Sequence, residues 1–215
     1  MMERLICIVI GYACGLLQTS YLYGKAHGID IREHGSGNAG TTNALRTLGT
    51  KAGVITFIGD CLKCMVAVLL VQLIFGKDHT EYIRLLRLYG AFGAILGHNF
   101  PFYLKFKGGK GIACTAGLLA SYHIPLGLVA LAVFVIVFVT THYVSLGSLL
   151  INLVFFFGTL YLGMSGAFNM APALLTEMYI LAGIICAMAF WKHRANIVRL
   201  ATGTENKTYL GKKKE

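Results

Sequence analysis

Long apolar runs separated by short polar breaks make up most of the chain. Residues 5–24 contain no charged side chain, and residues 111–191 contain one, Glu177. A helix needs about 20 mostly apolar residues to cross the hydrocarbon core of a bilayer. The runs predict an all-α integral membrane protein with seven transmembrane helices, folded as one domain over residues 1–215. The helices are expected near residues 5–24, 53–76, 85–101, 111–124, 126–142, 146–164 and 173–191.

The composition agrees with this pattern. Hydrophobic residues make up 56% of the chain, charged residues make up 13%, and the mean hydropathy is +0.68, all outside the usual range of soluble domains. The N-terminal segment, with Arg4 before an apolar run, could be mistaken for a signal peptide. Because residues 5–24 are longer than a typical signal-peptide core and further spans follow, they are interpreted as the first span.

The distribution of Lys and Arg predicts the orientation in the membrane. If the N-terminus lies outside, fifteen of the nineteen basic residues fall on the cytoplasmic side, and the outer side has four basic and four acidic residues. Cytoplasmic loops are normally the positive ones. The C-terminus is therefore expected in the cytoplasm and the chain in the cell (inner) membrane. Lys212, Lys213 and Lys214 are explained by this topology and by attraction to anionic lipid alone.

The cysteines and one charged pair are interpreted as structural. All six cysteines lie in or at the ends of apolar segments, where cysteine is typically a small packing residue. Cys61 and Cys64 form a C-x-x-C pattern, but no second ligand pair accompanies it, so no metal site, no cofactor and no sensitivity to chelators are expected. Asp60 and Lys63, three residues apart within a predicted span, are interpreted as an ion pair that supports the site.

The segment "HGSGNAGTTNALRTLG", residues 34–49, is the first candidate site. It contains G-x-G-x-x-G, but spans on both sides leave no room for the βαβ unit of a dinucleotide fold. Thr41 or Thr42 is a natural helix N-cap, free N–H groups at a helix start favour an anion, and Arg46 can bind a phosphate through two hydrogen bonds. A phosphate-binding loop and a simple turn capped by Asn38 and Asn43 remain equally good interpretations of this segment alone.

The second candidate is "GHNFPFYLKFKGGKGIACT", in which Lys105, Lys107 and Lys110 stand beside three glycines. Lys110 precedes a predicted helix, where positive charge opposes the helix dipole, and a bound anion would offset that unfavourable placement. The alternative, a purely topological signal, explains Lys105 and Lys107 well and Lys110 poorly.

The third candidate is "FWKHRANIVRL", which follows the last span and includes Trp191 as an interfacial anchor. His193, Asn196 and Arg199 share one face if the helix continues. An imidazole, an amide and a guanidinium together suit a phosphorylated polyol, whereas a solvated helix end is the alternative.

These three segments, in this order, resemble the motif regions of the bacterial acyl-phosphate:glycerol-3-phosphate acyltransferase family, PlsY. The resemblance also includes "GDCLK" and "THYVSLGS" and extends over nearly the whole chain. It implies seven spans, an outside N-terminus and an active site at the cytoplasmic face. The implied reaction transfers a fatty acyl group from acyl phosphate to the sn-1 hydroxyl of glycerol 3-phosphate, giving lysophosphatidic acid and phosphate.

The resemblance also assigns residues. The implied catalytic residues are Ser36, Lys110 and His193, and glycerol 3-phosphate would also contact Arg46 and Asn196. The phosphate of acyl phosphate would lie on the first loop, and the remaining implied substrate-binding residues are Gly37, Asn38, Gly40, Thr41, Thr42, Asn43, Gly108 and Gly109. One departure concerns the first span, where the family usually has "GSIP" and this chain has "GLLQ", residues 15–18, so that a kink or acyl-chain contact there is in question.

The chemistry can be considered separately. Acyl phosphate is already activated, so no strong protein nucleophile is needed, and Lys110 or loop N–H groups could stabilise the oxyanion. No H-x-x-x-x-D dyad is present in the sequence. A substrate phosphate oxygen is the expected proton acceptor, and His193 is the competing one.

Three other functions are compared with this one: a transporter or channel for a phosphorylated solute, a scaffold that binds anionic lipid, and a CoA-dependent acyltransferase. No internal repeat supports a transporter. The expected partners are the two substrates, the lipid bilayer and an acyl-phosphate-producing enzyme. No nucleic acid is expected.

Overall fold

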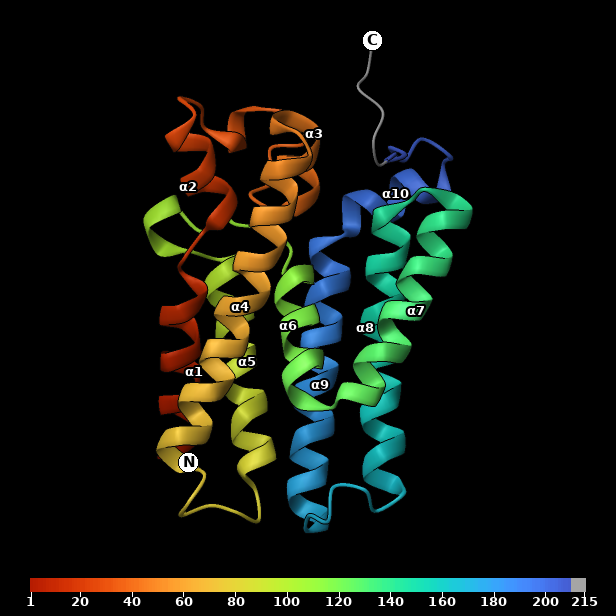
Figure 1. The fold of residues 1–215 in the computed structure, drawn as a ribbon. Coiled ribbons are helices and arrows are strands. Elements are labelled where there is room, and N and C mark those ends of the chain that lie inside the picture. The colour runs from red at the N-terminus through yellow and green to blue at the C-terminus, as the bar shows by residue number, and fades with distance from the viewer. Residues whose placement is uncertain (210–215) are drawn as a thin grey trace.

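The computed structural model describes residues 1–209, so Lys212, Lys213 and Lys214 lie outside the described residues. This part of the chain is helical, and the long helices lie side by side in a bundle (Figure 1). The helices are α1 Met2–Gly15, α2 Thr19–Ala26, α3 Thr41–Leu48, α4 Thr50–Phe75, α5 Ile83–Asn99, α6 Ile112–Tyr122, α7 Ile124–Thr141, α8 Val144–Met164, α9 Pro172–Lys192 and α10 Arg194–Ala201, with 3-10 turns η1 Ile31–Glu33 and η2 Phe102–Leu104.

Each predicted span coincides with helix over most of its length, and the all-α membrane assignment is confirmed. Five stretches within residues 1–209 are long and apolar enough to cross a membrane: Met2–Ala26, α4, α7, α8 and α9. Helix α5 has 17 residues and α6 has 11. Both are therefore shorter than the length of about 20 residues that a straight crossing requires.

The first predicted span is interrupted in the structure. Helix α1 ends at Gly15 and α2 begins at Thr19, although this stretch contains no proline. The Nε2 amide of the buried Gln18 donates hydrogen bonds of 3.2 Å to the carbonyl oxygens of Gly15, Gly97 and His98. The break that the "GLLQ" departure placed in question is therefore present. Side chains satisfy the carbonyl oxygens that it exposes: Gln18 donates to Gly15, the Tyr103 hydroxyl donates to Leu16 and the Lys63 ammonium donates to Leu17.

Glycines allow α1 and α5 to pack backbone against backbone. A Cβ atom on Gly11 would overlap the carbonyl oxygen of Gly90, and one on Gly97 would overlap that of Tyr12. Close approach through small residues is a common way to associate helices in a membrane, where lipid is as apolar as the side chains.

The short helix α6 lies between two groups of helices, with α1, α4 and α5 on one side and α7, α8 and α9 on the other (Figure 1). Its C-terminal carbonyl oxygens accept hydrogen bonds from two arginines of α5: Arg87 donates to Ser121, and Arg84 donates to Tyr122 at 3.1 Å. Positive charge at a helix C-terminus complements the dipole. Arg84 and Arg87 therefore stabilise the C-terminal end of α6.

The three candidate segments lie at one end of the bundle. Helices α2, α3 and α10 are at the end opposite the N-terminus, where η2 and the start of α6 also lie (Figure 1). Because the long helices run up and down through the bundle, segments far apart in the sequence are brought to the same end. This arrangement places all the predicted site residues within one region.

Candidate active site

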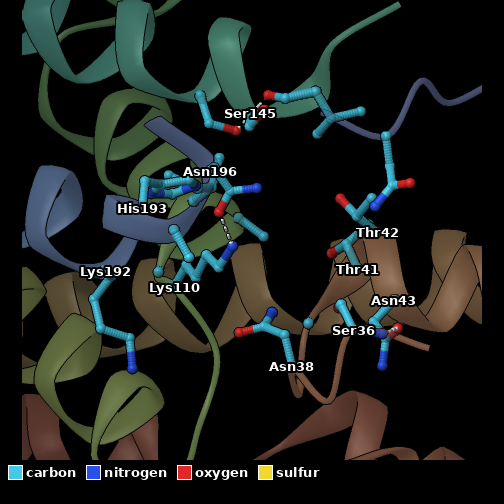
Figure 2. Close-up of a pocket in the computed structure, with 18 of the residues that line it drawn as sticks. Ser36, Asn38, Thr41, Thr42, Asn43, Lys110, Ser145, Lys192, His193 and Asn196 are labelled. Carbon is cyan, nitrogen blue, oxygen red and sulfur yellow. Dashed lines mark hydrogen bonds between the residues drawn. The ribbon is translucent and has the colours of Figure 1, made fainter. Parts of the chain in front are cut away.

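A cavity of about 540 Å³ opens at this end of the bundle, and residues from all three candidate segments line it. Figure 2 shows the first glycine-rich loop with the start of α3 on one side and Lys110, His193 and Asn196 facing it. Most of the predicted site residues are in the lining: Ser36, Gly37, Asn38, Gly40, Thr41, Thr42, Asn43, Arg46, Lys110, His193 and Asn196. The three segments that the sequence separates therefore form a single site.

The first loop is held in place by Asn43. Its Oδ1 accepts a hydrogen bond of 2.8 Å from the backbone N–H of Ser36, and its Nδ2 donates to the carbonyl oxygens of Ile31 and His34. Gly37 has φ of +68°, a conformation that favours glycine. A capped turn and a phosphate-binding loop are thus compatible interpretations of this segment, because the hydrogen bonds of Asn43 form the turn and also set the shape of the loop.

The start of α3 differs from the prediction. Gly40 is the N-cap residue, and neither Thr41 nor Thr42 caps the helix with its side chain. Glycine is an accepted N-cap. The hydroxyl of Thr41 is buried beside the cavity and has no hydrogen-bond partner among residues 1–209. This hydroxyl and the N–H groups of the first helical turn are consequently available to a ligand.

Lys110 contacts the third segment on its own side of the cavity. Its Nζ donates a hydrogen bond to Oδ1 of Asn196 (Figure 2). Burial, together with the nearby Arg199, lowers the pKa of Lys110 to about 8. The backbone turns into α6 at Gly111, which has φ of +84°. Lys110 is therefore a partly desolvated cation close to the opening of a helix, as expected for a group that meets an anion.

Gly108 and Gly109 are placed behind the cavity lining rather than in it. The backbone N–H of Gly109 donates to the carbonyl oxygen of His98 at 3.1 Å, and that of Gly108 donates to Asn99 at 3.3 Å. A Cβ atom on Gly109 would overlap the ring of His98 and would lie 2.9 Å from the carbonyl oxygen of Ala39. These glycines allow the second loop to approach the first.

His193 lies between two helices. Helix α9 ends at Lys192 and α10 begins at Arg194, so the single continuous helix considered for this segment is interrupted at the histidine. The Nδ1–H of the buried ring donates to the carbonyl oxygen of Ala189 at 2.8 Å, which leaves Nε2 as the acceptor of the neutral ring. Burial and the positive charge of Lys110 lower the pKa of His193 to about 4.

One acidic residue, which the sequence interpretation missed, links two side chains of the third segment. Glu205 is buried, and its two carboxylate oxygens accept hydrogen bonds from Asn196 at 2.9 Å and from Arg199 at 2.8 Å. Arg199 and Asn196 therefore share Glu205 as their partner, and this carboxylate balances the charge of Arg199. The only signal in the sequence is the position of Glu205 in "ATGTE", next to the third motif.

Arg46 points to the C-terminal segment. Its Nη2 donates to the carbonyl oxygen of Asn206 at 3.1 Å and to the hydroxyl of Thr208 at 2.6 Å, and the N–H of Thr208 donates to His142 at 2.9 Å. Residues 202–209 therefore connect α3 to the turn between α7 and α8. Ser145, in the first turn of α8, was also missed; it lines the cavity and has a buried hydroxyl without a partner among residues 1–209.

Positive charge dominates the lining of the cavity. Five cationic side chains face it, against two carboxylates; the cations are Arg46, Lys110, Lys192, Arg194 and Arg199, and the acids are Asp60 and Glu205. Within residues 1–209, no three His, Cys, Asp or Glu side chains are grouped so as to hold a metal ion. The site is therefore best suited to anions, and the fold and site together define a helical membrane protein that binds phosphorylated or carboxylated ligands.

Comparisons with known proteins specify the family. A model of the glycerol-3-phosphate acyltransferase family matches residues 5–203. The chain is 42% identical to a glycerol-3-phosphate acyltransferase of Clostridioides difficile (strain 630), over 98% of this chain and 97% of the relative. It is 38% identical to one of Thermoanaerobacter sp. (strain X514), over 100% of this chain and 99% of the relative.

Solved structures give the same answer. The fold is similar to a crystal structure of PlsY (YgiH), an integral membrane glycerol 3-phosphate acyltransferase, in its glycerol 3-phosphate form, with a TM-score of 0.80, 31% identity and 96% of both chains covered. The lysophosphatidic acid form of that protein matches with a TM-score of 0.78 and 30% identity, over 96% of this chain and 95% of that one. This chain belongs to the glycerol-3-phosphate acyltransferase family and is an enzyme of phospholipid synthesis, which confirms the resemblance found in the sequence.

Proposed function

We propose that this glycerol-3-phosphate acyltransferase takes its acyl group from acyl phosphate and transfers it to the sn-1 hydroxyl of glycerol 3-phosphate. The observation that supports this most strongly is one cavity with anion-binding groups on two facing sides. N–H groups and Thr41 face it from α3, and Lys110, His193 and Asn196 face it from the opposite side. Such a cavity suits two phosphorylated substrates held against each other.

The two substrates share the cavity, and glycerol 3-phosphate contacts residues from both of its sides. Ser36, Arg46, Lys110, His193 and Asn196 bind glycerol 3-phosphate in this proposal. The phosphate of the donor lies on the first loop and the start of α3, over Gly37, Asn38, Gly40, Thr41, Thr42 and Asn43. Phe57 and Phe134 line the same cavity. They supply an apolar surface for the beginning of the acyl chain.

In the proposed reaction, the sn-1 oxygen attacks the acyl carbonyl carbon, an ester C–O bond forms and the C–O bond to phosphate breaks. A phosphate oxygen accepts the hydroxyl proton, so phosphate leaves protonated and no protein group changes its charge. Lys110 stabilises the negative charge that develops on the carbonyl oxygen. The Nε2 atom of His193, a neutral acceptor in the cavity, orients the hydroxyl and is the alternative base.

The proposed topology has seven spans, the N-terminus outside and the site at the cytoplasmic face of the cell (inner) membrane. The exposed basic side chains Lys25, Lys51, Lys105 and Lys107 lie in segments at the cavity end of the bundle. They support this orientation through the positive-inside rule. Helices α5 and α6, although short, would complete the count, with an acyl-phosphate-producing enzyme delivering the donor from the cytoplasm.

The decisive experiment is a donor assay. Purified protein in detergent is given acyl phosphate or acyl-CoA, with and without glycerol 3-phosphate, and the release of phosphate or CoA is measured. Phosphate release that requires glycerol 3-phosphate, with no release of CoA, is the expected result. Consumption of acyl-CoA would identify a CoA-dependent enzyme.

A matched variant separates catalysis from the two remaining alternatives. Lys110→Ala should reduce turnover by at least a hundredfold while the protein still inserts and purifies, because it removes the cation closest to the reacting groups. A lipid-binding scaffold or a transporter would show no glycerol-3-phosphate-dependent turnover in the wild type. Exposed Lys107→Ala, next to the same loop, is the control and should retain the wild-type rate.

A further inference from the structure

A buried ionic cluster lies directly behind the cavity. Asp60 and Lys63 on α4 form an ion pair with 2.7 Å between Oδ1 and Nζ, and Nζ of Lys63 also lies 2.8 Å from Nδ1 of His98 on α5. All three side chains are at most 4% exposed. Asp60 and His98 nevertheless reach the cavity lining. The reaction described above uses none of these groups.

Burying these charges is not an efficient way to stabilise a bundle. The desolvation cost of a buried ion pair often equals or exceeds its Coulomb energy, and apolar residues of similar size can serve as well or better. The pair does satisfy one exposed backbone group, because Lys63 donates to the carbonyl oxygen of Leu17 at 2.7 Å in the break between α1 and α2. The contacts of His98 with Lys63 and with the space beside Gly109 indicate a second role for the cluster.

The cluster determines how the ring of His98 is protonated and oriented. An ammonium group only donates hydrogen bonds, so Nδ1 of His98 accepts from Lys63 and the proton of the neutral ring is on Nε2. Nε2 faces Gly109, at the position where a Cβ atom would overlap it, and makes no hydrogen bond within residues 1–209. The ring therefore fills the space beneath the glycine that precedes Lys110.

The backbone at His98 supports the same loop. Its carbonyl oxygen accepts from the N–H of Gly109 at 3.1 Å and from Gln18 at 3.2 Å. On the next residue, the carbonyl oxygen of Asn99 accepts from Gly108 at 3.3 Å and from Lys192 at 3.1 Å. The end of α5 thus connects the break in the first span to the loop that ends at Lys110.

We propose that Asp60, Lys63 and His98 form a positioning cluster, which orients the His98 ring beneath Gly109 and thereby sets the position of Lys110 relative to the first loop. This inference rests on the proposed function. An apolar filling of the same space would support the loop without fixing a direction. The charged pair adds a directional contact to the ring, and directional contacts are what hold a reacting group to within a fraction of an ångström.

The test compares single and double variants of similar shape. Asp60→Asn and Lys63→Met each leave one buried charge without its partner, so each should lower the Tm and the rate. The double variant Asp60→Asn/Lys63→Met has no unpaired charge and should have a higher Tm than either single variant, although it still lacks the donor to the Leu17 carbonyl. A positioning role predicts that its kcat stays at least tenfold low and that its KM for glycerol 3-phosphate stays raised.

Recovery of both Tm and kcat in the double variant would overturn the inference, because the cluster would then be purely structural. Thr159→Val is the control for removing a buried polar group away from the loop, and it should leave kcat and KM unchanged. If the double variant does not purify, His98→Asn decides. Asparagine retains an acceptor near Nδ1 but leaves the space beneath Gly109 empty, so the Tm should fall somewhat whatever the role of the ring. A raised KM for glycerol 3-phosphate in the folded variant supports positioning, and an unchanged KM refutes it.

A binding measurement separates this inference from the proposed function. The rise in Tm that glycerol 3-phosphate causes is measured for the wild type and for the double variant without any donor present. Loss of that rise only in the variant supports the positioning cluster, and an equal rise in both contradicts it. A wild type that shows the rise but does not react with acyl phosphate would contradict the proposed donor, and the inference about loop position would still be tested.

Discussion

At the scale of single residues, the site combines two nitrogen groups with opposite tasks. Lys110 is a cation whose pKa burial lowers to about 8, and His193 is a neutral ring whose pKa burial lowers to about 4. The same physical cause, loss of water around a charge, therefore leaves one group charged at pH 7 and keeps the other uncharged. A cation to hold an anion and an acceptor to orient a hydroxyl are what the proposed transfer requires.

The pKa of Lys110 predicts a pH dependence. Because its folded pKa is about 8, the ammonium loses its charge as the pH rises through that value in the unliganded enzyme. The KM for glycerol 3-phosphate should therefore rise severalfold between pH 7 and pH 9. Lys110→Arg, whose guanidinium stays charged, should have a higher KM at pH 7 and a flatter profile. A wild-type KM that does not change over this range would contradict the assignment.

The role of His193 can be tested by separating binding from chemistry. If phosphate accepts the proton, His193→Gln should raise the KM for glycerol 3-phosphate several-fold and leave kcat within about tenfold of the wild type, since a general base is usually worth about 10²–10⁴ in rate. Steady-state kinetics at saturating glycerol 3-phosphate measure this directly. Loss of kcat with substrate affinity intact would instead make His193 the base.

At the scale of elements, side-chain donors stabilise the break between α1 and α2, and the amide of Gln18 is the donor with the most acceptors. Gln18 donates to three carbonyl oxygens that belong to the ends of two helices, α1 and α5. In an apolar environment, each buried carbonyl left without a donor is costly. Proline can interrupt a helix because it lacks the backbone N–H donor. Here no proline is present, and side chains instead donate to the carbonyl oxygens at the break.

Gln18→Leu should therefore destabilise the protein strongly. A buried polar group that loses its partner costs about 1–3 kcal/mol, so loss of this shared amide is expected to lower the Tm by several degrees. Thermal unfolding in detergent measures the effect. Gln72→Leu, on α4 and without a side-chain hydrogen bond within residues 1–209, is the matched control and should change the Tm little. Equal effects of the two substitutions would show that the amide does not hold the break.

At the scale of the whole molecule, charge is arranged to suit a membrane with two different faces. Away from the cavity end, Arg84 and Arg87 donate to carbonyl oxygens of α6, and Arg4 is paired with Glu177. Arg4 is thus neutralised by a carboxylate, and Arg84 and Arg87 are held at the negative end of the α6 dipole. The exposed Lys105 and Lys107, by contrast, lie at the cavity end, which is the cytoplasmic end in the proposed topology.

Labelling of single cysteines in intact cells tests the proposed orientation. In a background with the six native cysteines replaced, Lys77→Cys lies in the turn between α4 and α5, and Lys107→Cys lies beside the cavity. A membrane-impermeant maleimide should label the first in intact cells and the second only after permeabilisation. The opposite pattern would invert the topology, and labelling of both without permeabilisation would place the two turns on one side.

Much of the site could be predicted because its main signals are local. The glycines of the first loop, Lys110 before a helix and His193 near Asn196 are each visible within a few residues of sequence. Glu205 and Ser145 were missed because neither residue type is unusual in its own segment. They become part of the site only in the folded chain, where Glu205 accepts a hydrogen bond from Asn196 and Ser145 lines the cavity.

The sequence alone determined the membrane class, the approximate helices and the three candidate segments that meet at the cavity, since hydropathy, charge and backbone freedom are properties of each stretch of chain. Only the tertiary structure decided that the first span is interrupted without proline, that Gly40 rather than a threonine is the N-cap residue of α3, and that Lys63 reaches His98 behind the cavity. The first and the last of these features depend on hydrogen bonds between residues tens of positions apart, from Gln18 to Gly97 and between Lys63 and His98. Such contacts exist only after the helices have packed, so no local pattern specifies them.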